Sequence, residues 1–171
     1  NPKEFARLYS NYLKSILDEL DYKRIADCIK ALEEARLSSK TIFVIGNGGS
    51  ASTASHIAND FGLAVLKNTN KITPSYRVMS LCDNISVISA ISNDSDFENI
   101  FLDQLKVHYR KGDVLLAVSA SGNSRNLIKA AKFVRKNQGT VISWLGFDGG
   151  ELKKHSDIPI IVKTPKGEYA P

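Results

Sequence analysis

Two short stretches of the sequence carry most of the residues whose types and spacing could do chemistry. The first, "GNGGSASTASHIAND", runs from Gly46 to Asp60, and the second, "SASGNS", runs from Ser119 to Ser124. Such turns expose backbone N–H groups and hydroxyls, which are donors for phosphate and sugar oxygens. His56 and Asp60 follow the first turn at an i, i+4 spacing. That spacing places both side chains on one helix face, where they could bind a metal or exchange protons.

The glycine-rich turn formally matches a dinucleotide-binding fingerprint. Gly46, Gly48 and Ala51 fit the pattern G-x-G-x-x-A. That fingerprint also needs an acidic residue about 20 positions later, which holds the ribose hydroxyls. The sequence near that distance is "AVLKNTNK", without an acid, and Asp83 lies much further along. We therefore expect no nucleotide cofactor.

The serine-rich turn predicts a phosphate site. It lies between an apolar run, "DVLLAVS", and the helical pattern "NSRNLIKAAKFVRKN". A helix N-terminus offers free N–H groups and the positive end of the helix dipole, and three hydroxyls add neutral donors. The alternative is that Ser121, Asn123 or Ser124 only caps the helix. One cap explains one serine but not three, so we favour phosphate binding.

The elements that position these turns alternate between β-branched runs and helical stretches. Strands are expected at residues 41–46, 76–81, 113–119, 140–146 and 158–164. Helices are expected between them, at residues 50–66, 84–93, 101–109, 123–137 and 149–156. This order predicts an α/β fold: a three-layer αβα arrangement around a doubly wound, five-stranded parallel sheet. The strand runs are mostly too apolar to alternate, so we expect both faces of the sheet to be buried.

The loops after the first three strands are rich in small polar residues. They read "GNGGS", "CDN" and "SASGNS", and they should meet at the carboxyl edge of the sheet, where such folds bind ligands. Residues 1–39 precede the sheet and contain two amphipathic helices, at 3–19 and 22–36. Their apolar faces could pack on a partner subunit or on the protein's own core.

Length and composition indicate one domain over residues 1–171. The chain is 43% hydrophobic and 24% charged, and its net charge of +5 is spread without a basic block. We expect no nucleic-acid partner, and no apolar run approaches the roughly 20 residues of a membrane span. The two cysteines, Cys28 and Cys82, are expected to be free thiols in a reducing, cytoplasmic compartment. A C-terminal helix is expected to follow "KTPKGEYAP".

Four linked motifs resemble a known family. They are "GNGGSAxxxxH", "SNDxxFxxIF", "GDVLLAVSxSGNS" and "GFDGGxLKxxxDI". With them the sequence resembles the sugar isomerase (SIS) phosphosugar-binding family, from the N-terminal helices to about Val162. Within it the chain is similar to the phosphoheptose isomerases, which convert sedoheptulose 7-phosphate to a D-glycero-D-manno-heptose 7-phosphate. That aldose–ketose isomerisation supplies heptose for lipopolysaccharide or capsule.

The resemblance implies a role for each loop. Phosphate is expected to bind at the serine-rich turn, at Ser119, Ala120, Ser121 and Ser124. The sugar is expected to lie against Asn47, Gly48, Gly49 and Ser50, with its hydroxyls meeting Asn93 and Asp94 of a neighbouring subunit's edge. The family is commonly a homotetramer with active sites at subunit interfaces. Ala120 stands where a threonine is usual, and its backbone N–H could still serve the phosphate.

His56 and Asp60 are the catalytic residues that the resemblance implies. Some members bind zinc with a histidine and a carboxylate at these positions, and with a Gln and a His from the C-terminal helix. Asp60 stands where the isomerases carry the glutamate that moves the proton. From the residues alone, His56 could instead be a packing histidine and Asp60 a solvated acid. Two other functions stay open: a non-catalytic SIS module that binds a phosphosugar or a protein, and an isomerase of another sugar phosphate.

Overall fold

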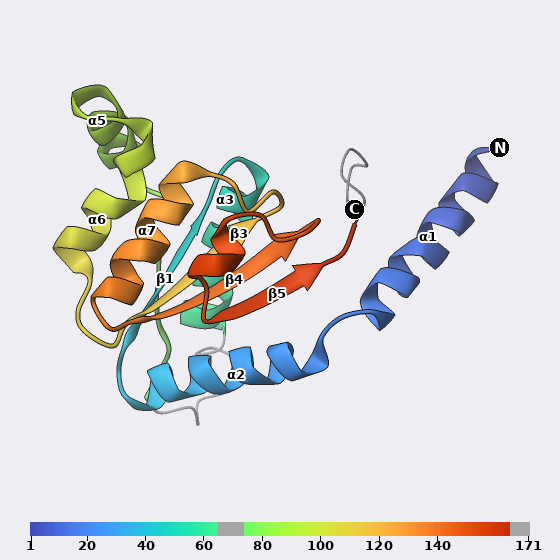
Figure 1. The fold of residues 1–171 in the computed structure, drawn as a ribbon, viewed down its shortest axis with the longest axis horizontal. Coiled ribbons are helices and arrows are strands. Elements are labelled where there is room, and N and C mark those ends of the chain that lie inside the picture. Colours follow the sequence, from blue (N-terminus) through green and yellow to red (C-terminus); the bar gives the residue numbers. More distant parts are fainter. Residues whose placement is uncertain (65–73, 165–171) are drawn as a thin grey trace.

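A parallel sheet forms the middle layer of the molecule (Figure 1). The computed structural model describes residues 1–64 and 74–164. In this part of the chain the strands are β1 (Thr41–Gly46), β2 (Arg77–Ser80), β3 (Val114–Ser119), β4 (Thr140–Gly146) and β5 (Ile158–Val162). They pair in the order β2-β1-β3-β4-β5, and every pair is parallel, so all five carboxyl ends lie at one edge. The predicted α/β fold is confirmed.

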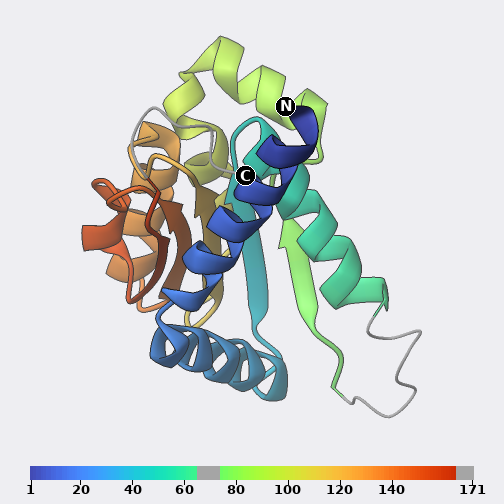
Figure 2. The ribbon, with the colours of Figure 1, turned by 90° about the vertical axis from the view of Figure 1, so that its right-hand side faces the viewer.

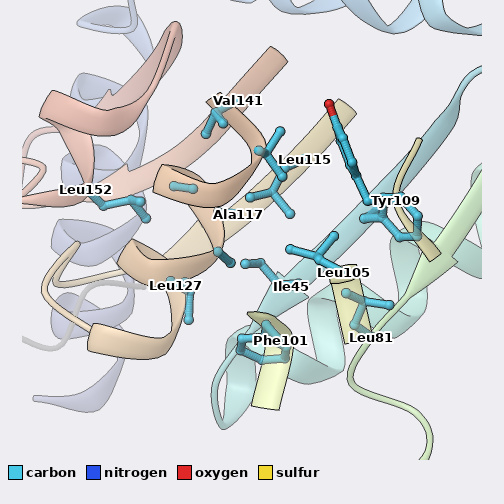
Figure 3. Packing of buried hydrophobic residues seen from close by; sticks show 14 of the residues in the cluster. Ile45, Leu81, Phe101, Leu105, Tyr109, Leu115, Ala117, Leu127, Val141 and Leu152 are labelled. Carbon is cyan, nitrogen blue, oxygen red and sulfur yellow. The ribbon is translucent and has the colours of Figure 1, made fainter. Parts of the chain in front are cut away.

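Two apolar clusters fill the core, one on each face of the sheet. The larger cluster lies between one face and the helices that cover it (Figure 3). Phe43 and Ile45 of β1 point into this cluster. The covering elements are α5 (Ile85–Asp94), α6 (Ile100–His108), α7 (Arg125–Lys136) and η3 (Leu152–His155), and the short helix η2 (Phe97–Asn99) lies between α5 and α6 in the chain. Among them, Phe101 and Leu105 of α6 and Leu127 of α7 are almost completely buried.

A second cluster buries the opposite face. Ile42 and Val44, which alternate with Phe43 and Ile45 along β1, point into it. The covering helices are α2 (Tyr22–Leu37) and α3 (Gly49–Asn59). Because both faces of the central strands are covered, β1 and β3 read as nearly continuous apolar runs rather than alternating ones.

The edge strands depart from the prediction that both faces are buried. All five residues of β5 are half-buried, and β2 alternates between exposed and half-buried positions. Each lies at an edge of the sheet, where the helical layers give less cover. The expectation was therefore right for the central strands and wrong for these two.

Two predicted helices also differ in detail. The helix expected at residues 50–66 ends as an α-helix at Asn59 and continues as a π-helical turn, η1 (Asp60–Ala64). Residues 65 and 66 lie outside the described residues. The helix expected at 149–156 is a 3₁₀ helix that begins at Leu152, because Gly149 and Gly150 have φ of 84° and 53° and cannot belong to a right-handed helix.

The two N-terminal helices differ in how they pack. Asp21 caps α2, since its Oδ1 accepts from the backbone N of Arg24 at 3.0 Å, and Cys28 and Leu32 pack α2 against the core. By contrast, α1 (Pro2–Asp18) buries only Ile16. Figure 1 shows α1 projecting from the end of α2, away from the sheet. Within the described residues, no helix has both the length and the apolar character needed to cross a bilayer.

Candidate functional site

Three polar loops meet at the carboxyl edge of the sheet, as the sequence predicts. Figure 2 shows the turn between β1 and α3 at this edge. Asn47 follows β1, Gly48 adopts a φ of 54°, and α3 begins at Gly49. The turn is closed by Ser50, whose backbone N donates to the carbonyl of Asn47 at 3.0 Å.

The serine-rich loop follows β3 and leads into α7. Ser119 is buried, and its Oγ accepts from the backbone N of Gly122 at 3.1 Å. The Oγ of Ser121 accepts from the backbone N of Asn123 at 3.3 Å. Ser124 occupies the N-cap position of α7, but its side chain makes no capping hydrogen bond. Simple capping therefore does not account for Ser124, and its hydroxyl lies beside the N-terminus of α7.

The fourth motif, which begins "GFDGG" and continues through Leu152, donates backbone hydrogen bonds to the serine-rich loop. The backbone N of Gly146 donates to Ala120 at 3.0 Å, and that of Leu152 donates to Gly122 at 2.8 Å. A Cβ on Gly122 would lie 2.1 Å from the carbonyl oxygen of Gly149. Only glycine allows this approach between two backbones, so the shape of the loop depends on a segment about 25 residues later in the chain.

His56 and Asp60 lie close together at the far end of α3. The Nε2 of His56 is 3.0 Å from the Oδ2 of Asp60, and the two side chains are 76% and 48% exposed. Asp60 is the first residue of the π-helical turn, a distortion often found at functional sites. Residues 1–64 and 74–164 contain no group of three or more His, Cys, Asp or Glu side chains that could hold a metal ion. The pair thus offers one nitrogen and one oxygen ligand.

The comparisons with known proteins agree with this architecture. The SIS domain model matches residues 4–146. The chain belongs to the SIS-domain family. It is 36% identical over 161 residues to a phosphoheptose isomerase of Clostridium acetobutylicum, covering 92% of this chain and 80% of that protein. It is 37% identical over 149 residues to that of Rhodospirillum rubrum, covering 82% and 77%. The structure of phosphoheptose isomerase GmhA from Neisseria gonorrhoeae superposes with a TM-score of 0.84 at 26% identity, covering 98% and 90%.

Asn126 of this SIS domain is a site residue that the sequence did not reveal. It is 2% exposed and lies in the first turn of α7. Its Nδ2 donates to the Oδ1 of Asn47 at 2.9 Å, and the Nδ2 of Asn47 donates back at 3.0 Å. In the sequence Asn126 belongs to an ordinary helical pattern, and no local signal marks it. The pair joins the glycine-rich turn to the helix that follows the serine-rich loop.

The loop after β2 holds α3 in place. The carboxylate of Asp83 accepts hydrogen bonds from Ser55 of α3 and from Ser80, the latter at 3.0 Å. The thiol of Cys82 donates to the carbonyl of Gly46 at 3.4 Å. Burial raises the pKa of the Cys82 thiol, which keeps it protonated as a donor. This loop thus contacts the start of the glycine-rich turn and the middle of the helix that follows it.

A cavity of about 280 Å³ lies between the glycine-rich turn and the serine-rich loop. Ser50, Ser119 and Ala120 line it together, so the structure brings three of the predicted substrate residues to one space. Trp144 and Thr164 line the same cavity and were not predicted. Thr164 is 7% exposed, and its hydroxyl has no hydrogen-bond partner within the part of the chain described.

Asn93 and Asp94 lie apart from these loops. They end α5, both are exposed, and the Nδ2 of Asn93 donates to the Oδ1 of Asp94 at 2.8 Å. Among the described residues, no hydrogen bond or ion pair joins either of them to the glycine-rich or serine-rich loop. His108 is exposed, while His155 is half-buried with its Nε2 3.3 Å from the Oε1 of Glu151.

Proposed function

We propose that this protein is a phosphoheptose isomerase that interconverts sedoheptulose 7-phosphate and a D-glycero-D-manno-heptose 7-phosphate. The observation that carries the proposal is the similarity to proteins of that name over 92% of the chain, at 36% identity. The structure supports the chemistry, since this SIS domain presents a serine-rich helix N-terminus and a cavity without charged lining residues at the carboxyl edge of the sheet, and a His–Asp pair at the far end of α3.

The phosphate binds at the N-terminus of α7. Ser119, Ser121 and Ser124 supply hydroxyls, and the backbone N–H of Ala120 and those of the first helical turn supply further donors. Ser124 supports this role because its side chain is not used for capping. No lysine or arginine is needed in the cradle, since the helix dipole and neutral donors stabilise the anion.

The sugar lies against the glycine-rich turn, at Asn47, Gly48, Gly49 and Ser50. The cavity beside Ser50 has no charged lining residue, which suits a neutral polyol chain. Asn47 keeps limited hydrogen-bonding capacity for the sugar, because Asn126 already uses one of its donors and one of its acceptors. Asn93 and Asp94 meet sugar hydroxyls from the edge of a neighbouring subunit.

Asp60 acts as the base in the isomerisation. It removes the proton from the carbon next to the carbonyl, the C–H electron pair becomes the enediol double bond, and the carbonyl oxygen takes up a proton. Return of the proton to the neighbouring carbon, together with loss of the proton from the other enediol hydroxyl, forms the new carbonyl group and completes the reaction. His56, with its Nε2 3.0 Å from Asp60, orients the carboxylate and holds a substrate oxygen.

Zinc is a cofactor that His56 and Asp60 could help to hold. An imidazole nitrogen and a carboxylate oxygen are suitable zinc ligands, and the 3.0 Å separation shows that the two side chains can converge on one point. Within residues 1–64 and 74–164 of one subunit, no third His, Cys, Asp or Glu side chain joins the pair to complete such a site. A bound zinc supplies Lewis-acid polarisation of the carbonyl oxygen. We propose no nucleotide cofactor.

The protein assembles as a homotetramer in the cytoplasm. The apolar face of α1 is uncovered, since Phe5 is 70% and Leu8 56% exposed. On α5 no residue is buried, and the apolar side chain of Ile85 is 78% exposed. Surfaces of this kind are usual where subunits meet. Two free cysteines are consistent with a reducing compartment.

A coupled assay with sedoheptulose 7-phosphate tests the reaction. The intact protein is expected to turn over the substrate, and Asp60→Asn to lose about 10²- to 10⁴-fold in kcat. Asp27→Asn is the control, because Asp27 only pairs with Lys23 on α2. If the protein binds the phosphosugar without turnover, it is a regulatory binding module instead. If Asp60→Asn is as active as the control, Asp60 is not the base.

A further inference from the structure

Two cations near the N-terminus of α7 share one carboxylate. Arg125 and Lys129 stand at an i, i+4 spacing, and both reach Glu98 of η2. The Nη1 of Arg125 is 2.9 Å from one oxygen of Glu98, and the Nζ of Lys129 is 3.0 Å from the other. The side chain of Glu98 is 27% exposed, while those of Arg125 and Lys129 are 81% and 40% exposed, so the carboxylate is half-buried and the two cations face the solvent.

Further hydrogen bonds connect Lys129 and Glu98 to the other residues of the turn after α5, at residues 95–99. Lys129 also donates to the Oδ1 of Asn99 at 3.1 Å, and Asn99 donates to the hydroxyl of Ser95 at 2.7 Å. The backbone N of Glu98 donates to the Oδ1 of Asp96 at 2.7 Å. An isolated exposed ion pair contributes little to a structure, but a network that fixes both the backbone and the side chain of its central residue contributes more.

The end of α5 leads directly into this turn. In the described structure the most extensive contacts of α5 are with η2 and α6, and Ile88 and Ile91 of α5 are half-buried against the core, but α5 has no fully buried residue. Asn93 and Asp94 are its last two residues, directly before the turn that Glu98 anchors. The Arg125 guanidinium, with help from Lys129, holds the pKa of Glu98 below its usual range.

We propose that Glu98 is a positioning residue, which fixes the segment carrying Asn93 and Asp94 against the N-terminal turns of α7 by bridging Arg125 and Lys129. The effect on turnover rests on the proposed function, in which Asn93 and Asp94 meet the sugar. The effect on the local stability of this segment, as hydrogen exchange measures it, does not depend on the proposed function. A misplacement of about 1 Å in such a segment can lower a rate by up to about 10²-fold.

Hydrogen exchange in the full chain tests the positioning without any substrate. The variants are Glu98→Gln, which keeps the shape of the side chain, and Lys129→Met, which removes one of the two cations. The control is Glu34→Gln, whose carboxylate is 3.9 Å from Lys30 on α2. Peptides covering residues 92–99 should exchange at least about threefold faster in Glu98→Gln, and to a smaller extent in Lys129→Met. Peptides covering residues 126–136 and all peptides of the control should keep wild-type rates.

Kinetics and phosphate binding complete the test. With sedoheptulose 7-phosphate, kcat/KM of Glu98→Gln should fall about 10- to 100-fold. Its Kd for inorganic phosphate should stay within about twofold of wild type, since the cradle itself is unchanged. Unchanged exchange of residues 92–99 would overturn the proposal, as would a phosphate Kd that shifts together with kcat/KM, which would mean that Glu98 acts on the cradle. If the wild type itself shows no turnover, the proposed function fails, while the exchange and phosphate measurements still decide the role of Glu98.

Discussion

Asn47 and Asn126 are hydrogen-bonded to each other in both directions, at 3.0 and 2.9 Å, across 79 positions of the chain. Asn126 also accepts from the backbone N of Leu127 at 3.0 Å, so its amide is fixed within α7. The glycine-rich turn and the N-terminus of α7 therefore form one rigid unit. In the proposed enzyme this unit sets the distance between the sugar and the phosphate.

Asn126→Ala is expected to loosen this unit. The substitution leaves the half-buried amide of Asn47 without its partner, which should lower the free energy of unfolding by about 1–3 kcal/mol. Urea unfolding measures the change, and KM for the phosphosugar should rise as well. The exposed Asn11 on α1 provides the control, since Asn11→Ala should stay within about 0.5 kcal/mol of wild type. Equal urea midpoints for the two variants would contradict the role given to the pair.

Gly122→Ala is expected to destroy the serine-rich loop. Gly122 has a φ of 63°, and an added Cβ would meet the backbone of Gly149 at 2.1 Å, so the two loops have to separate. The free energy of unfolding should fall by about 2 kcal/mol or more, and stabilisation by inorganic phosphate should disappear. In contrast, Gly49→Ala adds a methyl group to the start of α3, where no atom lies within 4 Å. It should be neutral or stabilising by up to about 1 kcal/mol. Similar losses in both variants would argue against the close approach of the two loops.

Ser124→Ala separates phosphate binding from helix capping. Because Ser124 makes no capping hydrogen bond, its removal should change the free energy of unfolding by less than about 0.5 kcal/mol without phosphate. With increasing inorganic phosphate, the rise in Tm should be smaller than in wild type. Asp21 is a true N-cap, so Asp21→Ala should cost about 1 kcal/mol at every phosphate concentration. A phosphate-independent loss in Ser124→Ala would restore the capping interpretation.

The sequence predicted the features of this fold that depend on local pattern. The apolar runs of β1 and β3 and the stripes of α2 and α7 were found within a few residues, because burial of a strand or helix face leaves a periodic record. The His56–Asp60 contact was also predicted, since i, i+4 spacing on a helix brings two side chains together.

Contacts between segments that are far apart in the sequence produce no periodic pattern of apolar residues. Asn126 and Glu98 look like ordinary helical and surface positions, and only the pairing of loops in space gives them partners. The exposure of β5 and β2 depends on the order of the strands, which the alternation of elements does not fix. The π-helical turn at Asp60 was missed because the apolar pattern continues through it.

The uncovered face of α1 predicts how the proposed homotetramer can be broken. Leu8 is 56% exposed in one subunit, and burying a leucine against a neighbour contributes about 1.5–3 kcal/mol. Leu8→Glu replaces that contribution with a charge, so it should weaken subunit association at least about tenfold and yield smaller species in sedimentation velocity. Lys14→Glu changes the charge of the same helix at an exposed position and should sediment like wild type. If Leu8→Glu and wild type sediment alike, α1 is not a subunit contact, and the apolar face must serve another purpose.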